Sequence, residues 1–121
     1  MQALNHLDKG RVVIFACGTG NPYFSTDTAA ALRSAEIGAQ VLLSAKNIDG
    51  IYTGDPKTDT KAVKIDRISY MEFINRELKA MDATAVQICM ENKIPVIAFG
   101  LKEKGAMLKI IKGEKIGTII D

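Results

Sequence analysis

The 121-residue sequence predicts an α/β fold with a mostly parallel sheet. Three nearly continuous apolar runs, residues 12–16, 41–45 and 96–99, are typical of strands that are buried on both faces. Segments with helical periodicity separate these runs, and that alternation indicates βαβ units. A chain of this length, 47% apolar, is sufficient for one domain with its own core.

The first helix is expected over residues 27–37, in the alanine-rich stretch that is the next helical segment after the first apolar run. Ala31, Leu32 and Ala35 form an apolar stripe at helical spacing, and small alanines permit close packing on a sheet. Gly38 is placed to end this helix, because glycine readily adopts the left-handed conformation of a helix C-terminus.

Later elements follow the same pattern. Ser69 and Glu72 have the spacing of a capping box, which predicts a second helix over residues 69–79. The remaining expected elements are a helix over residues 82–92, a strand after Pro95, a short helix over residues 105–111 and a final edge strand over residues 117–121.

Composition excludes several classes of protein. The net charge of +2, without a dense block of Lys or Arg, argues against a nucleic-acid partner. No apolar run approaches membrane length, and no signal-peptide pattern is present, so no membrane partner is expected. Cys17 and Cys89 lie far apart in apolar runs, which predicts buried, reduced thiols in a cytoplasmic protein.

The segment 18-GTGNPYFSTD-27 joins the first expected strand to the first expected helix. Ligands of open α/β sheets bind beyond the carboxyl ends of strands, and a helix N-terminus there favours an anion. Gly18 and Gly20 allow close approach of the backbone, and Asp27 is an N-cap candidate. The alternative is a capped turn that binds nothing. The side chains that could donate to phosphate oxygens are those of Thr19, Asn21, Ser25 and Thr26.

Nearly the whole chain resembles bacterial-type uridylate kinases (UMP kinases) of the amino acid kinase family. The resemblance is carried by residues 11–43, by 45-AKNIDGIYTGDP-56, by 81-MDATA-85 and by 113-GEKIGTII-120. The GTGNP stretch with the following aromatic pair is specific to uridylate kinases, whereas the DG-x-aromatic-x-x-DP motif occurs more widely in the family. The resemblance implies an αβα sandwich, a homo-hexamer, and transfer of a phosphoryl group from ATP to UMP with Mg²⁺.

The resemblance also implies two sets of site residues. Residues 19–26 match the segment that holds UMP, and its beginning would lie nearest the UMP phosphate. Asp27 matches the catalytic carboxylate that organises the reaction centre. The UMP-binding residues implied are Thr19, Gly20, Asn21, Pro22, Tyr23, Phe24, Ser25 and Thr26.

On the ATP side, the resemblance implies contacts from Lys46, Asn47, Tyr52 and Asp55. Tyr52 would contact the adenine region and Asp55 the ribose hydroxyls. The family varies at the first two positions, so the choice between Lys46 and Asn47 stays open. Without the resemblance, Tyr52 could equally anchor its long polar loop, and Asp55 before a proline could simply begin a turn.

The resemblance covers the C-terminal half of these kinases. No K-x-S-G or GGGN sequence occurs in the 121 residues, although the family's N-terminal half carries such segments around the ATP phosphates. Residues 1–121 are therefore expected to be the C-terminal nucleotide-binding part, inactive alone and with exposed apolar surface. Two alternatives remain: another amino acid kinase that acts on a carboxylate or carbamate, and a non-enzymatic nucleotide-binding or assembly fragment.

Overall fold

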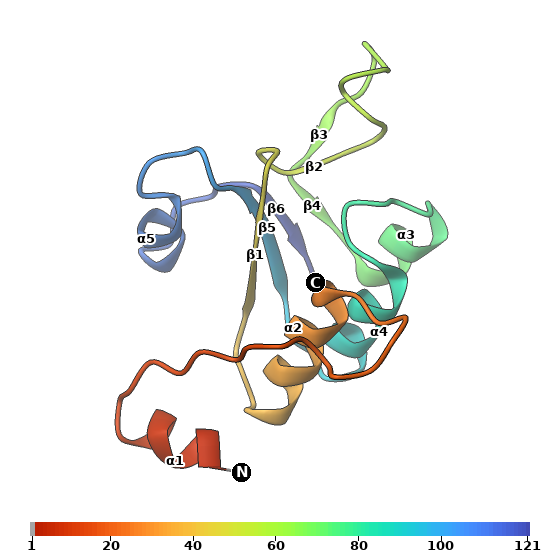
Figure 1. The fold of residues 1–121 in the computed structure, drawn as a ribbon. Helices are drawn as coiled ribbons and strands as arrows, with labels where there is room; N and C mark the ends of the chain where they lie inside the picture. Colours follow the sequence, from red (N-terminus) through yellow and green to blue (C-terminus); the bar gives the residue numbers. More distant parts are fainter. Residues whose placement is uncertain (1) are drawn as a thin grey trace.

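The computed structural model describes residues 2–121, and helices lie on both faces of a central sheet (Figure 1). The helices are α1 (Gln2–Asp8), α2 (Thr26–Glu36), α3 (Tyr70–Asn75), α4 (Ala83–Glu91) and α5 (Ala106–Ile111). The strands are β1 (Leu42–Lys46), β2 (Ile51–Tyr52), β3 (Lys64–Ile65), β4 (Arg67–Ile68), β5 (Val96–Gly100) and β6 (Thr118–Ile120).

The four-stranded sheet has the order β1-β5-β6-β4. β1 pairs with β5 and β4 pairs with β6 in parallel, while β5 and β6 are antiparallel. The expected α/β fold with a mainly parallel sheet is therefore confirmed. The expected edge position of the last strand is wrong: β6 lies inside the sheet, and Ile120 is fully buried. β2 and β3 form a separate antiparallel ribbon.

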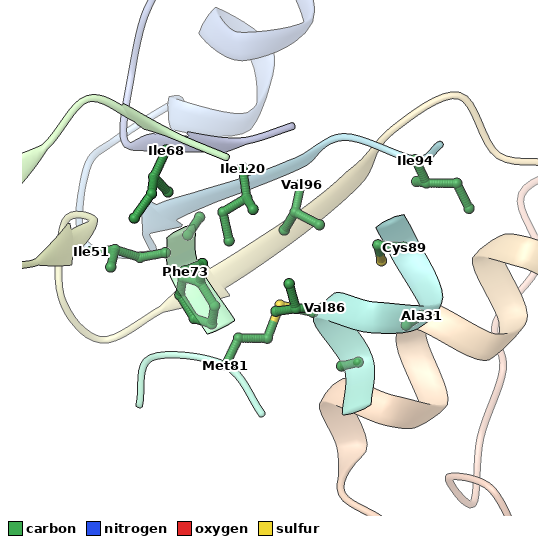
Figure 2. Packing of buried hydrophobic residues seen from close by; sticks show 12 residues of the cluster. Ala31, Ile51, Ile68, Phe73, Met81, Val86, Cys89, Ile94, Val96 and Ile120 are labelled. Atoms are coloured by element: carbon green, nitrogen blue, oxygen red, sulfur yellow. The ribbon is translucent and has the colours of Figure 1, made fainter. Parts of the chain in front are cut away.

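β5 shows why the sheet needs a helix layer on each face. Successive side chains of a strand point to opposite faces. Val96 and Ala98 belong to the large cluster that contains residues of α2, α3 and α4, several of which Figure 2 shows. Ile97 and Phe99 pack instead with α5, in a smaller second cluster. The continuous apolar run at 96–99 thus reflects burial on both faces, as predicted.

α2 and α4 lie against each other on one face of the sheet (Figure 1). Ala31 of α2 and Ala85 of α4 are both completely buried, so small side chains line the contact between these helices. Phe73 of α3 and Met81 extend the same cluster (Figure 2). Loss of the Phe73 side chain would cost about 3–5 kcal/mol, the usual range for a fully buried phenylalanine.

α3 ends four residues before the expected Lys79. Ser69 caps it as predicted, since its hydroxyl accepts a hydrogen bond from the Glu72 backbone N–H at 3.1 Å. Glu77 then adopts a positive φ of 53°, and the Leu78 N–H bonds to the Phe73 carbonyl at 3.4 Å. This is a Schellman closure, which stops the helix, and residues 76–80 continue as a turn and a loop.

The first predicted strand is not formed. Residues 12–16 have no regular secondary structure and no strand partner within residues 2–121, and Val12 and Ile14 are 94% and 89% exposed. An apolar run becomes a strand only where a neighbour shares its backbone hydrogen bonds. For the same reason the prediction of a buried Cys17 is wrong, because this thiol is exposed, whereas Cys89 is buried as expected.

No helix between residues 2 and 121 combines the length and apolar character that crossing a bilayer requires.

Candidate functional site

The turn at residues 18–25 leads into the N-terminus of α2. Gly20 has a φ of 76°, and Tyr23 has a φ of 68°, a conformation uncommon for a residue with a side chain. The Tyr23 ring is fully exposed. The turn therefore holds an aromatic ring away from the protein surface, beside the free backbone N–H groups of a helix N-terminus.

Thr19 and Asn21 stabilise the beginning of this turn. The Thr19 hydroxyl accepts a hydrogen bond from the Asn21 backbone N–H at 3.1 Å. The Asn21 side-chain amide donates to the Thr19 carbonyl at 3.4 Å, a long and weak contact. Asn21 is exposed, so its amide is free to exchange this contact for one with a ligand.

Ser25, and not Asp27, is the N-cap of α2. The Ser25 hydroxyl accepts a hydrogen bond from the Thr28 backbone N–H at 3.1 Å. The suggestion that Asp27 is the cap is therefore wrong, because the helix begins one residue earlier, at Thr26. Asp27 lies in the first helical turn, where the helix dipole favours a negative charge, and its carboxylate remains available for other partners.

Asp82 connects the N-termini of two helices. Its carboxylate accepts hydrogen bonds from the hydroxyls of Ser25 and Thr28, the latter at 3.2 Å. The same carboxylate caps α4, because it accepts from the Ala85 backbone N–H at 2.8 Å. The sequence predicted Asp82 only as the start of a helix. Its position in the MDATA stretch was a signal of a wider role, but the link to Ser25 needs the tertiary structure.

The two expected half-sites meet at Asp27 and Lys46. The Lys46 ammonium donates to Asp27 Oδ1 at 3.3 Å, and the two side chains are partly buried, at 21% and 29% exposed. Lys46 is the last residue of β1, and its carbonyl accepts from the Leu101 N–H at 2.9 Å, which holds the strand end against β5. A carboxylate from the glycine-rich turn thus lies beside a cation from the long polar loop.

A cavity of about 470 Å³ lies between the polar loop and the segment released after α3. Residues 50–56 form one wall and residues 76–80 the other, with Leu78 and Ala80 as apolar lining. Both Tyr52 and Asp55 line it. Ligand pockets are commonly apolar clefts of this size with a few polar groups, and this cavity has that character.

Tyr52 and Asp55 are each held by a local contact. The Tyr52 hydroxyl donates to Asp49 Oδ1 at 2.8 Å, and this hydrogen bond raises the pKa of the Tyr52 phenol. One carboxylate oxygen of Asp55 accepts from the Lys57 backbone N–H at 2.9 Å, as in an Asx turn. The ring of Tyr52 and the other Asp55 oxygen remain able to meet a ligand in the cavity.

The structure does not bring every predicted residue to one place. Thr26 lines a second cavity, of about 370 Å³, beside α2. Three other predicted residues, Pro22, Phe24 and Asn47, are exposed. The Asn47 side chain makes no hydrogen bond to another residue of 2–121. Two pairs of predicted residues do come together: Asp27 with Lys46 where the two half-sites meet, and Tyr52 with Asp55 in the larger cavity.

Comparison with known proteins decides the family. The model of the amino acid kinase family matches residues 1–100. The chain belongs to the amino acid kinase family. This membership accounts for the three layers and the mainly parallel sheet, which the solved members share.

Among named relatives, the chain is 55% identical over 119 residues to the protein called uridylate kinase PUMPKIN, chloroplastic, of Arabidopsis thaliana. Among solved members of the amino acid kinase family, it superposes on the UMP kinase of Bacillus anthracis with a TM-score of 0.96 at 33% identity. The UMP kinase of Ureaplasma parvum gives a TM-score of 0.89 at 36% identity.

The matches cover nearly all of this chain but only part of each relative. They span 98% of the chain and 35% of the Arabidopsis protein. The two bacterial structures are matched over 99% of this chain and over 50% and 52% of their own chains. The chain therefore spans a third to a half of the relatives that it matches within the amino acid kinase family.

Proposed function

We propose that residues 1–121 are the C-terminal nucleotide-binding part of a UMP kinase, which transfers the γ-phosphoryl group of ATP to UMP and yields ADP and UDP. The contact between Asp27 and Lys46 is the main observation in support of this function. The contact joins the residue that follows the proposed acceptor turn to the residue at the start of the long polar loop, so two nucleotides bound on these two sides would face each other.

The acceptor side is the turn at residues 19–26 and the N-terminus of α2. Free N–H groups and the positive end of the helix dipole favour a phosphate at this position. Thr19, Gly20 and Asn21 begin the turn and would hold the UMP phosphate, while exposed Tyr23 and Phe24 would meet the nucleoside. Ser25 would support the turn through its hydrogen bonds to α2 and Asp82.

The donor side is the cavity between residues 50–56 and 76–80. The Tyr52 ring and the apolar Leu78 and Ala80 side chains would line the adenine site. The unshared Asp55 oxygen would accept from the ribose hydroxyls. Between Lys46 and Asn47 the geometry favours Lys46 as the contact to ATP, because its ammonium lies at the junction of the two sides.

Phosphoryl transfer asks the protein mainly for positioning and charge stabilisation. An oxygen of the UMP phosphate forms the new bond to the γ-phosphorus as the bond to the bridging β,γ-oxygen breaks. Lys46 would offset part of the negative charge of ATP. Asp27, in the first turn of α2, would hold Lys46 in place and orient the reacting groups.

We propose that Mg²⁺ accompanies ATP. Within residues 2–121, no three His, Cys, Asp or Glu side chains gather as a metal cluster. That arrangement fits Mg²⁺, which in kinases binds through one or two carboxylates together with the substrate phosphates. Asp27 is the carboxylate at the junction, and Mg²⁺ there would neutralise charge on the phosphate oxygens.

We further propose that the working enzyme is a homo-oligomer, a hexamer as in the implied family pattern, and that it acts in the cytoplasm. Exposed apolar side chains of α5 support an assembly, among them Leu108 and Ile111, which are 57% and 70% exposed. Cys17 is a free and exposed thiol, which persists best in a reducing compartment. Light scattering during gel filtration measures the assembly, and a fluorescent fusion reports the compartment.

The test is an assay of ATP-dependent UDP formation in two preparations. The first is residues 1–121 alone. The second, termed the complemented enzyme below, is residues 1–121 mixed with or fused to the half of the Bacillus anthracis UMP kinase that they do not match. We expect no turnover by the first and clear turnover by the second, with UMP preferred over CMP, carbamate and amino acid substrates.

Either of two results would contradict the proposal. Failure of the complemented enzyme to make UDP, although it folds and binds ATP, would favour the non-enzymatic or the carboxylate-kinase alternative. Turnover by residues 1–121 alone, at the rate of the complemented enzyme, would show that the catalytic groups are all within this chain.

A further inference from the structure

The 113–120 stretch contributes no residue to the two nucleotide half-sites, but its threonine is buried between the main sheet and the β2–β3 ribbon. Thr118, the first residue of β6, is fully buried in spite of its hydroxyl. The hydroxyl accepts a hydrogen bond from the Ile51 backbone N–H at 2.9 Å and donates one to the Ile65 carbonyl. One side chain of the main sheet therefore bonds to both strands of the β2–β3 ribbon.

The ribbon carries the donor loop. Tyr52 is the second residue of β2, and the loop that follows contains Asp55. The ribbon and the four-stranded sheet are separate sheets: β3 runs into β4 through Asp66, but no ladder of backbone hydrogen bonds joins β2 to the main sheet. Thr118 supplies a direct hydrogen-bonded link where the strand ladder supplies none.

Two glycines allow the close packing around Thr118: Gly50 on the side of the ribbon and Gly117 on the side of β5. A Cβ on Gly50 would lie 2.9 Å from the Thr118 hydroxyl and 2.8 Å from the Lys64 Cε. A Cβ on Gly117, whose φ is 76°, would lie 2.0 Å from the Ala98 carbonyl oxygen. These contacts are shorter than real Cβ contacts. A larger residue at position 50 would therefore push the ribbon away from Thr118, and one at position 117 would push the start of β6 away from β5.

We propose that Thr118 is a positioning residue for the ATP site, and that its hydroxyl, seated by Gly50 and Gly117, sets the place of the Tyr52–Asp55 loop relative to the sheet. The link to ATP rests on the function proposed above. The anchoring itself does not, because it follows from contacts within the chain.

The first test is amide hydrogen exchange on residues 1–121 with three variants. Thr118→Val removes the hydroxyl, Thr118→Ser retains it, and Thr60→Val is a matched control on the exposed part of the same loop. Thr118→Val leaves the Ile51 N–H buried without an acceptor, so exchange at Ile51 and Thr53 should rise roughly 10-fold or more. Exchange at Ile97 and Phe99 in β5 should not change.

Thr118→Ser and Thr60→Val should retain the exchange pattern of the unaltered chain. If Thr118→Val fails to fold, Gly50→Ala provides a second route, since its new methyl group displaces the hydroxyl and removes no core atom. Unchanged exchange at Ile51 and Thr53 would overturn the proposal. A uniform rise across β5 as well would also overturn it, since Thr118 would then serve only general stability.

The second test is kinetic and uses the complemented enzyme. Thr118→Val should raise the KM for ATP by about 3- to 10-fold, the range expected for one lost neutral hydrogen bond, and leave the KM for UMP unchanged. Thr118→Ser should restore the value. Equal changes in both constants would overturn the link to ATP. If no variant makes UDP, the function proposed above is wrong, and exchange alone decides the anchoring.

Discussion

Asp27 and Lys46 lie 19 residues apart in sequence, and the fold brings the Lys46 ammonium to 3.3 Å from Asp27 Oδ1. Each side chain comes from a different half-site: Asp27 from the first turn of α2, and Lys46 from the end of β1. Their contact is the point where the proposed acceptor and donor nucleotides would meet.

We expect the two members of this pair to affect different kinetic constants. In the complemented enzyme, Asp27→Asn should lower kcat by about 100-fold, the usual loss when a preorganised charge at a reaction centre is removed. Lys46→Met should mainly raise the KM for ATP. Steady-state kinetics with both substrates varied measures both effects.

The matched control is Glu103→Gln, which breaks an ion pair with Lys109 at 3.4 Å, outside the two half-sites. Exposed pairs of this kind contribute little, so activity should stay within a factor of two or so. A kcat for Asp27→Asn close to that of the unaltered enzyme would remove Asp27 from the reaction centre.

Asn21→Ala should weaken the handling of UMP more than that of ATP. A hydrogen bond to a charged group contributes about 1.5–3 kcal/mol, so kcat/KM for UMP should fall roughly 10- to 150-fold. The long contact between Asn21 and the Thr19 carbonyl is weak, so the turn itself should survive the change. Asn92→Ala, at the C-cap of α4, is the control for general loss of stability. An unchanged UMP profile would rule out Asn21 as a phosphate contact.

Tyr52 allows the ring and the hydroxyl to be tested separately. Tyr52→Ala should raise the KM for ATP by roughly 5- to 10-fold, since an aromatic stacking partner contributes about 1 kcal/mol beyond the area that it buries. Tyr52→Phe removes only the hydrogen bond to Asp49 and should change the KM for ATP much less. If the KM for UMP moves while that for ATP does not, the two half-sites are reversed.

Cys89 should make the fold less stable in alkaline solution. Burial raises the pKa of its thiol from 9.0 to about 11. Because the unfolded chain ionises first, the stabilisation is complete below pH 9 and is lost as the pH rises towards 11. By linkage the free energy of unfolding should fall by roughly 2–3 kcal/mol across this range.

Urea unfolding of residues 1–121 at pH 8, 9, 10 and 11 measures this loss. Cys89→Ala should be less stable at pH 8, because it leaves a small cavity, and should lose less stability at high pH. Cys17→Ala is the control, because that thiol is exposed and should leave the pH profile unchanged. Parallel profiles for Cys89→Ala and the unaltered chain would show that Cys89 does not cause the alkaline loss.

Local sequence determined the elements whose signals are local. Ser69 and Asp82 cap their helices because a short polar side chain can satisfy the N–H groups of the first turn. The run at 96–99 is a strand covered on both faces because all its side chains are apolar. The resemblance to uridylate kinases was also readable from motifs, and the family comparison confirmed the amino acid kinase family.

Tertiary structure decided everything that depends on a neighbour. Residues 12–16 are as apolar as β5, yet they form no strand, because pairing needs a partner that residues 2–121 do not place beside them. β6 is central and not at the edge for the converse reason, since β5 and β4 both pair with it. The contacts of Asp27 with Lys46 and of Thr118 with Ile51 join positions distant in sequence. A hydrogen bond or ion pair between distant residues leaves no local pattern, so only the folded chain shows it.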